Sequence, residues 1–102
     1  MNAYIYVIRP TRLGMVTDEP TAAEQSALER HFEYLQNLAE QGIALHVGRS
    51  TNEDENIFGL VIFRAESVGD AQKIMNTDPA IKEGIMTGDV FPYKAVLGFS
   101  AP

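Results

Sequence analysis

The chain has no cysteine among its 102 residues. That absence excludes disulfides, thiolate metal sites, iron–sulfur clusters and a cysteine nucleophile, and it fits a reducing compartment such as the cytoplasm. No apolar run approaches the roughly 20 residues that a membrane-spanning helix needs. The first ten residues also lack the charged and then apolar segments of a secretory signal. We therefore expect a cytoplasmic protein with no membrane partner.

Basic residues are scarce. Eight Lys and Arg stand against 14 Asp and Glu, so the net charge is -6 at pH 7. Nucleic-acid binding depends on neutralised phosphates, and basic and aromatic residues do not alternate here as a base-stacking surface requires. No nucleic-acid partner is expected. Hydrophobic residues make up 45% of the chain and charged residues 22%, which is typical of a folded globular domain.

The hydrophobic pattern predicts four strands and two helices in one domain covering residues 1–102. The strands are expected over residues 3–9, 43–48, 57–63 and 90–99. An amphipathic helix follows a long polar loop over residues 11–20. It begins near Thr21, where Thr21 and Glu24 form a capping-box pattern, and ends at Gly42. A second helix begins at Ser67 and ends at Asp78-Pro79.

The order β-α-β-β-α-β predicts a ferredoxin-like α+β fold, a four-stranded antiparallel sheet with helices on one face. In the first strand, Tyr4, Tyr6 and Ile8 would share one face, whereas Ile5 and Val7 would share the other. Two helices can cover only one face of such a sheet. Because the second face is apolar as well, we expect a homodimer that packs through it.

Only two histidines are present, His31 and His46. His31 lies on the apolar stripe of the first predicted helix, which is formed by Leu28, His31, Phe32, Leu35, Leu38 and Ala39. It is either a core histidine with a hydrogen-bond partner or a general base in a pocket between helix and sheet. His46 is expected to have a structural or surface role. Two histidines without a ligand cluster do not predict a metal site, and no cofactor is expected.

Asp78 precedes Pro79 between the second helix and a short following turn. As an N-cap it would accept a backbone amide of that turn. As a functional carboxylate it would orient the imidazole of His31. Both roles can hold together, because a carboxylate has several acceptor positions.

Several arginines and tyrosines are candidate ligand-binding residues. Arg9 and Arg49, like Arg12 and Arg64, lie near strand ends or in loops, and each can recognise an anion or remain solvated. The hydroxyls of Tyr6 and Tyr34 can reach a pocket, although tyrosines in such positions also serve as core residues.

A series of short motifs between His31 and Tyr93 resembles the YCII-related family. The matching residues are His31-Phe32-Glu33-Tyr34-Leu35, Gly42, Gly48, Glu66-Ser67-Val68, Ala71, Asp78-Pro79 and Gly84. The resemblance implies a dimeric α+β barrel and a pocket with a His–Asp pair, here His31 and Asp78. The chain departs from the family at Ala80, where members often carry an aromatic residue, and in the longer loop over residues 11–20.

These features lead to three hypotheses. The first is an enzyme without a cofactor that uses His31 as an acid or base on a small polar or aromatic molecule, by isomerisation, elimination or lyase chemistry. The second is a ligand-binding module without turnover. The third is a structural protein in which His31 and Asp78 only stabilise a helix junction. Some family members are linked to the breakdown of chlorinated aromatic compounds, but a shared fold does not decide between these hypotheses.

Overall fold

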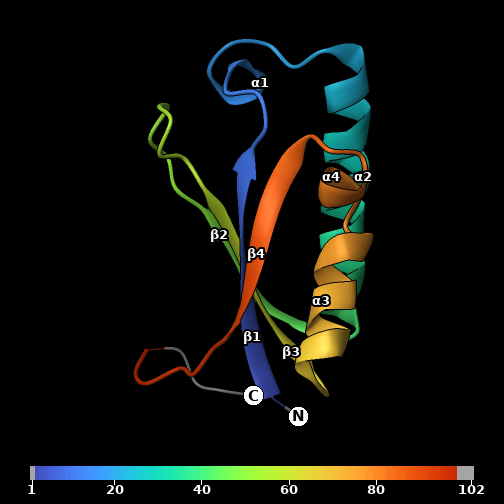
Figure 1. Cartoon of the computed structure of the whole chain (residues 1–102), viewed down its shortest axis with the longest axis vertical. Helices are drawn as coiled ribbons and strands as arrows, with labels where there is room; N and C mark the ends of the chain where they lie inside the picture. Colours follow the sequence, from blue (N-terminus) through green and yellow to red (C-terminus); the bar gives the residue numbers. More distant parts are fainter. Residues whose placement is uncertain (1, 99–102) are drawn as a thin grey trace.

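A computed structural model describes residues 2–98 of the chain (Figure 1). Its elements are β1 (Asn2–Pro10), α1 (Gly14–Thr17), α2 (Ala22–Glu40), β2 (Ala44–Arg49), β3 (Gly59–Ala65), α3 (Val68–Thr77), α4 (Pro79–Lys82) and β4 (Met86–Pro92). The four strands form one sheet in the order β2-β3-β1-β4, and every neighbouring pair is antiparallel. This arrangement confirms the predicted ferredoxin-like α+β fold.

The core lies between the sheet and helices α2, α3 and α4, which share one side of it in Figure 1. Strand β1 is central and turns Tyr4, Tyr6 and Ile8 towards the helices, as its alternation predicts. Val61 and Phe63 on β3 pair with Tyr6 and Tyr4 and lie on the same face. The rings of Tyr6 and Phe63 meet edge to face, with centroids 5.5 Å apart.

Helix α2 begins as predicted. The Thr21 side chain accepts the amide of Glu24, and the Glu24 carboxylate accepts the amide of Thr21, which completes the capping box. The predicted stripe was partly wrong, because Phe32 is 63% exposed and Ala39 is exposed, whereas Ala27 is fully buried. Phe32 lies on the wall of a cavity between the helix and the sheet, so it contacts open space in place of the core.

The last strand was predicted over residues 90–99, and this range was wrong. Strand β4 pairs with β1 from Pro10 opposite Met86 to Tyr4 opposite Pro92. The alternation was hidden by Gly88, which faces the core and has no side chain. Beyond Pro92, β1 has almost no residues left to pair with, so residues 93–98 form no strand. Phe99 lies outside the described residues.

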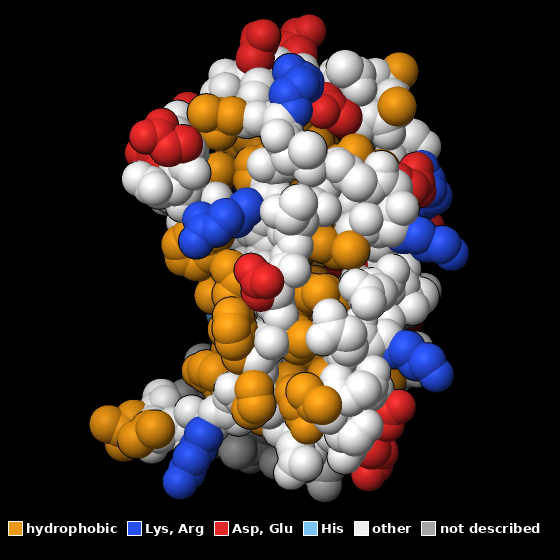
Figure 2. Space-filling view, viewed as in Figure 1, with side chains coloured by type: hydrophobic (Ala, Val, Ile, Leu, Met, Phe, Trp, Pro, Cys, Tyr) orange, Lys and Arg blue, Asp and Glu red, His pale blue; other side chains and the backbone are white. Residues whose placement is uncertain are grey.

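The sheet face away from the helices carries apolar side chains together with exposed polar ones, among them His46 and Asp89. It carries Ile5 and Val7 from β1, Leu60 from β3 and Phe91 from β4, and Phe91 is 49% exposed. Figure 2 shows hydrophobic side chains gathered along this side of the molecule. No helix among residues 2–98 is long and apolar enough to cross a membrane.

Candidate functional site

A buried hydrogen-bonded cluster joins three elements of the core. The Nδ1 atom of His31 on α2 lies 2.7 Å from Oδ1 and 2.9 Å from Oδ2 of Asp78, between α3 and α4. The hydroxyl of Tyr6 on β1 donates to Asp78 Oδ2 at 2.7 Å, and the amide of Ala80 donates to Oδ1 at 2.9 Å. The structure therefore brings together His31, Asp78 and Tyr6, which are far apart in the sequence.

Asp78 is fully buried, with no exposed side-chain surface. Its position follows from local sequence, because the residue ends α3 and its carboxylate caps the first turn of α4, where Pro79 needs no amide partner. A buried carboxylate is costly unless donors surround it. Here the Ala80 amide, the Tyr6 hydroxyl and the His31 ring supply them, so both roles predicted for Asp78 are compatible with one geometry.

Tyr6 holds its hydroxyl proton firmly. Burial, followed by the negative charge and the hydrogen bond of Asp78, raises the pKa of Tyr6 well above its ordinary value. The phenol is therefore a donor to Asp78 across the accessible pH range. The side chain is completely buried and does not line the cavity, so Tyr6 acts on a ligand only indirectly, through Asp78 and then His31.

The contact with Asp78 fixes how the His31 imidazole presents its two nitrogens. A carboxylate accepts, so Nδ1 carries the proton, and in the neutral ring Nε2 keeps its lone pair. Nε2 has no hydrogen-bond partner among residues 2–98. In the same part of the chain, every buried side-chain N or O atom has a hydrogen-bond partner. Nε2 is therefore accessible, and His31, whose side chain is 13% exposed, lines the cavity.

This cavity has a volume of about 390 Å³ and lies between α2 and the sheet. Its lining residues are almost all apolar, and only His31 and Arg49 have polar side chains. A mainly apolar pocket with few polar groups is the usual form of a small-molecule site. The other lining residues are Ile8, Pro10, Val16, Leu28, Phe32, Leu35, Val47, Gly48, Ile57, Phe58, Gly59, Leu60, Val61 and Met86.

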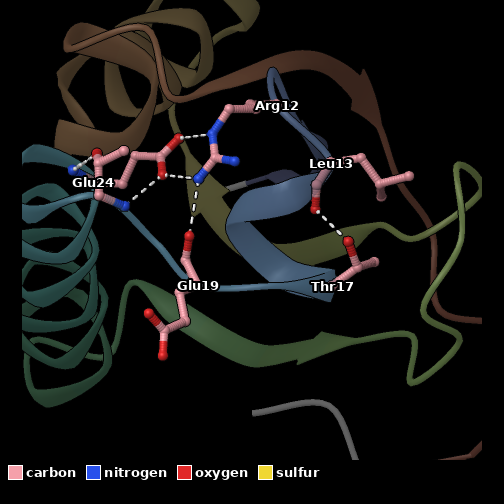
Figure 3. Close-up of polar contacts among 6 residues, drawn as sticks. Arg12, Leu13, Thr17, Glu19 and Glu24 are labelled. Atoms are coloured by element: carbon pink, nitrogen blue, oxygen red, sulfur yellow. Dashed lines mark hydrogen bonds and ion pairs between the residues drawn. The ribbon is translucent and has the colours of Figure 1, made fainter.

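The segment over residues 11–20 supplies part of the cavity wall. It was predicted as a loop but contains helix α1, which buries Met15 and brings Val16 to the cavity. Figure 3 shows how Arg12 ties this segment to α2: its Nε donates to Glu24 Oε2 at 3.0 Å, and its Nη2 donates to the Glu19 carbonyl at 3.0 Å. The hydrogen bonds from Arg12 and, after them, from the Thr21 amide lower the pKa of Glu24 to about 2.

Sequence reasoning missed this part of the site. The apolar residues Leu13, Met15 and Val16 were the available signal, because apolar residues clustered in a long loop indicate a buried turn. Arg12 was considered only as one of four possible anion-binding arginines. Its partner Glu24 was assigned to the capping box alone, yet one carboxylate serves both contacts.

The remaining candidates lie away from the cavity wall. The guanidinium of Arg9 lies 5.7 Å from the ring centre of Phe58 and donates to the carbonyl of Asn56 at 3.4 Å. The hydroxyl of Tyr34 donates to the Ile74 carbonyl at 2.7 Å, and burial and the charge of Asp78 raise the pKa of Tyr34 to about 12. His46 is exposed and pairs with Ile62 on the outer sheet face.

Metal-binding residues do not cluster in the described part of the chain. Between residues 2 and 98, no three His, Asp or Glu side chains come close enough together to hold a metal ion.

Comparison with known proteins gives a family and a fold. The model of the YCII-related domain matches residues 10–94. The chain is similar to 5-chloro-2-hydroxyhydroquinone dehydrochlorinase from Burkholderia phenoliruptrix AC1100, solved in complex with 2,5-dihydroxybenzoquinone, with 19% identity, a TM-score of 0.63, and 89% of this chain and 93% of that chain covered. An uncharacterized protein from Thermotoga maritima is 13% identical, with a TM-score of 0.52 and coverages of 90% and 95%. At these identities the likeness shows the fold alone. No curated protein matches the sequence.

Proposed function

Because this chain belongs to the YCII-related family, whose domain spans residues 10–94, we propose that its cavity is the active site of an enzyme that moves a proton on a small molecule without a cofactor. One observation carries the proposal. The imidazole of His31 has its Nδ1 held by a buried carboxylate and its Nε2 accessible at the wall of an apolar cavity. This is the arrangement that a general base requires.

In the proposed reaction, Nε2 of His31 removes a proton from a C–H or O–H group of the substrate. The electron pair of the broken bond stays on the substrate. In an elimination it forms the new double bond, while the leaving group departs with its own electron pair. In an isomerisation the imidazolium returns the proton to a different atom of the same molecule. Neither route requires an electron acceptor or a further reactant.

Asp78 is the positioning residue of this mechanism. Its carboxylate holds the ring orientation and the Nδ1–H tautomer, and it stabilises the imidazolium that forms during proton transfer. Tyr6 and the Ala80 amide hold the carboxylate in place. The dehydrochlorinase that shares the fold acts on a chlorinated hydroxyquinol, as its name states, so substituted aromatic rings are the first substrates to test.

The test is proton exchange in heavy water. The protein is incubated with candidate carbon acids, including hydroxylated and chlorinated aromatic compounds, and NMR follows loss of C–H signals and formation of products. We expect exchange or turnover with the wild type and its loss in His31→Gln, whereas His46→Gln keeps the activity because His46 lies on the outer face. Equal rates in both variants would remove His31 from the mechanism. Saturable binding without exchange would favour a ligand-binding module.

We further propose that the chain forms a homodimer through the outer sheet face. The support is a group of apolar side chains that no helix covers, since apolar patches on protein surfaces mark interfaces: Phe91 is exposed, and Ile5, Val7 and Leu60 are partly exposed. Light scattering at micromolar concentration should give twice the mass of the chain. Val7→Glu on that face should give a monomer, whereas Val68→Glu, at an exposed position of α3, should not. A monomeric wild type would contradict the proposal.

A further inference from the structure

The only charge on the residues that line the cavity is positive. Of the residues that form the wall, only Arg49 carries a permanent charge, and none is Asp or Glu. The other polar side chain, His31, is neutral or positive. Arg49 is exposed, so its guanidinium lies where the cavity meets solvent, and the apolar lining beside it strengthens its attraction for an anion relative to open water. A cation would meet this guanidinium without any carboxylate in the wall to balance it.

Arg49 stands on the sheet face that looks towards α2. It ends β2 and pairs with Gly59 of β3, which in turn pairs with Ile8 of β1, and residues paired across strands share a face. A side chain at position 59 would lie on this face between Arg49 and Ile8. Its Cβ would come within 3.2 Å of the Ile8 Cγ1 atom. Glycine at this position therefore leaves the cavity floor open beside Arg49.

The protein itself does not neutralise this arginine. Arg12 and Arg30 are paired with Glu24 and Glu83. In contrast, the side chain of Arg49 makes no hydrogen bond, ion pair or ring contact within residues 2–98, although the chain has 14 acidic residues. Its guanidinium keeps all its donors, and their planar fork matches the two oxygens of a carboxylate.

We infer that the cavity binds a small organic anion, with an apolar body and one carboxylate that pairs with Arg49. The apolar part of the ligand then lies along the cavity wall between β2 and α2. With its carboxylate at Arg49 on β2, the ligand directs its reacting group towards His31 on α2. The volume of about 390 Å³ suits this ligand, because a cavity of about 150 Å³ is enough for benzene. Small organic anions would be the substrate class of the proposed enzyme, and only their turnover rests on the proposed function; their binding does not.

The test compares matched probes. Phenylacetate and its neutral amide, phenylacetamide, have nearly the same shape and differ in charge, and acetate has the charge without the body. Binding is measured by NMR chemical-shift titration of the wild type, Arg49→Gln and Arg64→Gln. Arg64 is the control because it is also a strand arginine without an ion pair within residues 2–98 and does not line the cavity.

We expect the wild type and Arg64→Gln to bind phenylacetate about tenfold more tightly than phenylacetamide, and Arg49→Gln to bind the two equally. Acetate should bind far more weakly than phenylacetate, because it lacks the apolar body. Equal affinity of the wild type for acid and amide would overturn the inference. So would an unchanged preference in Arg49→Gln, or no binding of phenylacetate at millimolar concentration.

A fourth variant separates this inference from the proposed function. His31→Gln should keep the preference for phenylacetate over phenylacetamide, because the charge preference comes from Arg49. If this preference is present but no substrate is turned over, the cavity is an anion site and the enzyme proposal fails alone. If turnover depends on His31 but uncharged substrates react as well as carboxylates, the anion inference fails alone.

Discussion

Tyr6→Phe removes a single oxygen atom from the buried cluster around Asp78. The substitution keeps the ring that packs against Phe63 and deletes the hydroxyl that donates to Asp78 Oδ2 at 2.7 Å. Both partners are fully buried. A hydrogen bond to a charged group contributes about 1.5–3 kcal/mol to folding stability. Water cannot easily replace this donor at a completely buried position, so we expect a loss of about 2 kcal/mol.

Urea unfolding, followed by circular dichroism, measures this loss directly. For a domain of this size, about 1 kcal/mol corresponds to about 4–8 °C in melting temperature, so the variant should melt roughly 8–16 °C below the wild type. Tyr4→Phe is the matched control. Tyr4 lies on the same strand and face, but its hydroxyl makes no hydrogen bond to any of residues 2–98. It should change stability by less than about 0.5 kcal/mol.

Two results would refute this reasoning. If Tyr6→Phe were as stable as the wild type, the hydroxyl would not be a significant donor to Asp78. If both variants lost about 2 kcal/mol, the cost would come from changing a core tyrosine and not from this hydrogen bond. Either result would also contradict the role of Tyr6 in holding the Asp78 carboxylate in the proposed mechanism.

Three further predictions concern packing and pH. Gly88→Ala should destabilise the fold by about 1–3 kcal/mol, because the new Cβ would lie 3.0–3.1 Å from atoms of three core side chains. In the control Gly69→Ala on α3, the new Cβ meets nothing closer than 3.8 Å, so this variant should be neutral or more stable by up to about 1 kcal/mol. Equal losses of stability for the two variants in urea unfolding would contradict the packing argument. The hydrogen bonds from Arg12 and, after them, from the Thr21 amide lower the pKa of Glu24 from 4.5 to about 2. The stabilisation from these contacts is therefore present above pH 4.5 and is lost as the pH falls towards 2. The stability gap between wild type and Glu24→Gln should narrow over that range, and a constant gap would count against the contact. The pKa of Tyr34 is raised from 10 to about 12, so the stability that the protonated Tyr34 contributes is complete below pH 10 and is lost towards pH 12. Tyr34→Phe should remove a late phase from the phenolate absorbance titration, and an unchanged late phase would refute the raised pKa.

Local sequence patterns predicted most of the secondary structure. The capping box at Thr21 and Glu24 and the break at Asp78-Pro79 are each formed by residues within a few positions of one another, and the structure shows both. The last strand was misplaced because its pattern depends on a distant partner. Gly88 is tolerated in β4 because Ile8 and the helices fill the space beside it, which no local pattern reveals.

The sequence by itself determined the alternation of β1, the apolar face of α2 and the cap at Asp78, because side-chain periodicity and capping act over short separations. Only the tertiary structure decided that the Asp78 carboxylate meets His31, 47 residues away, and Tyr6, 72 residues away. The contact exists because β1 lies between β3 and β4 in the sheet, so that a central tyrosine reaches the junction of two helices that pack above it. The same packing placed Arg49 beside a glycine in the cavity, a neighbourhood that depends on register between strands and on no local pattern.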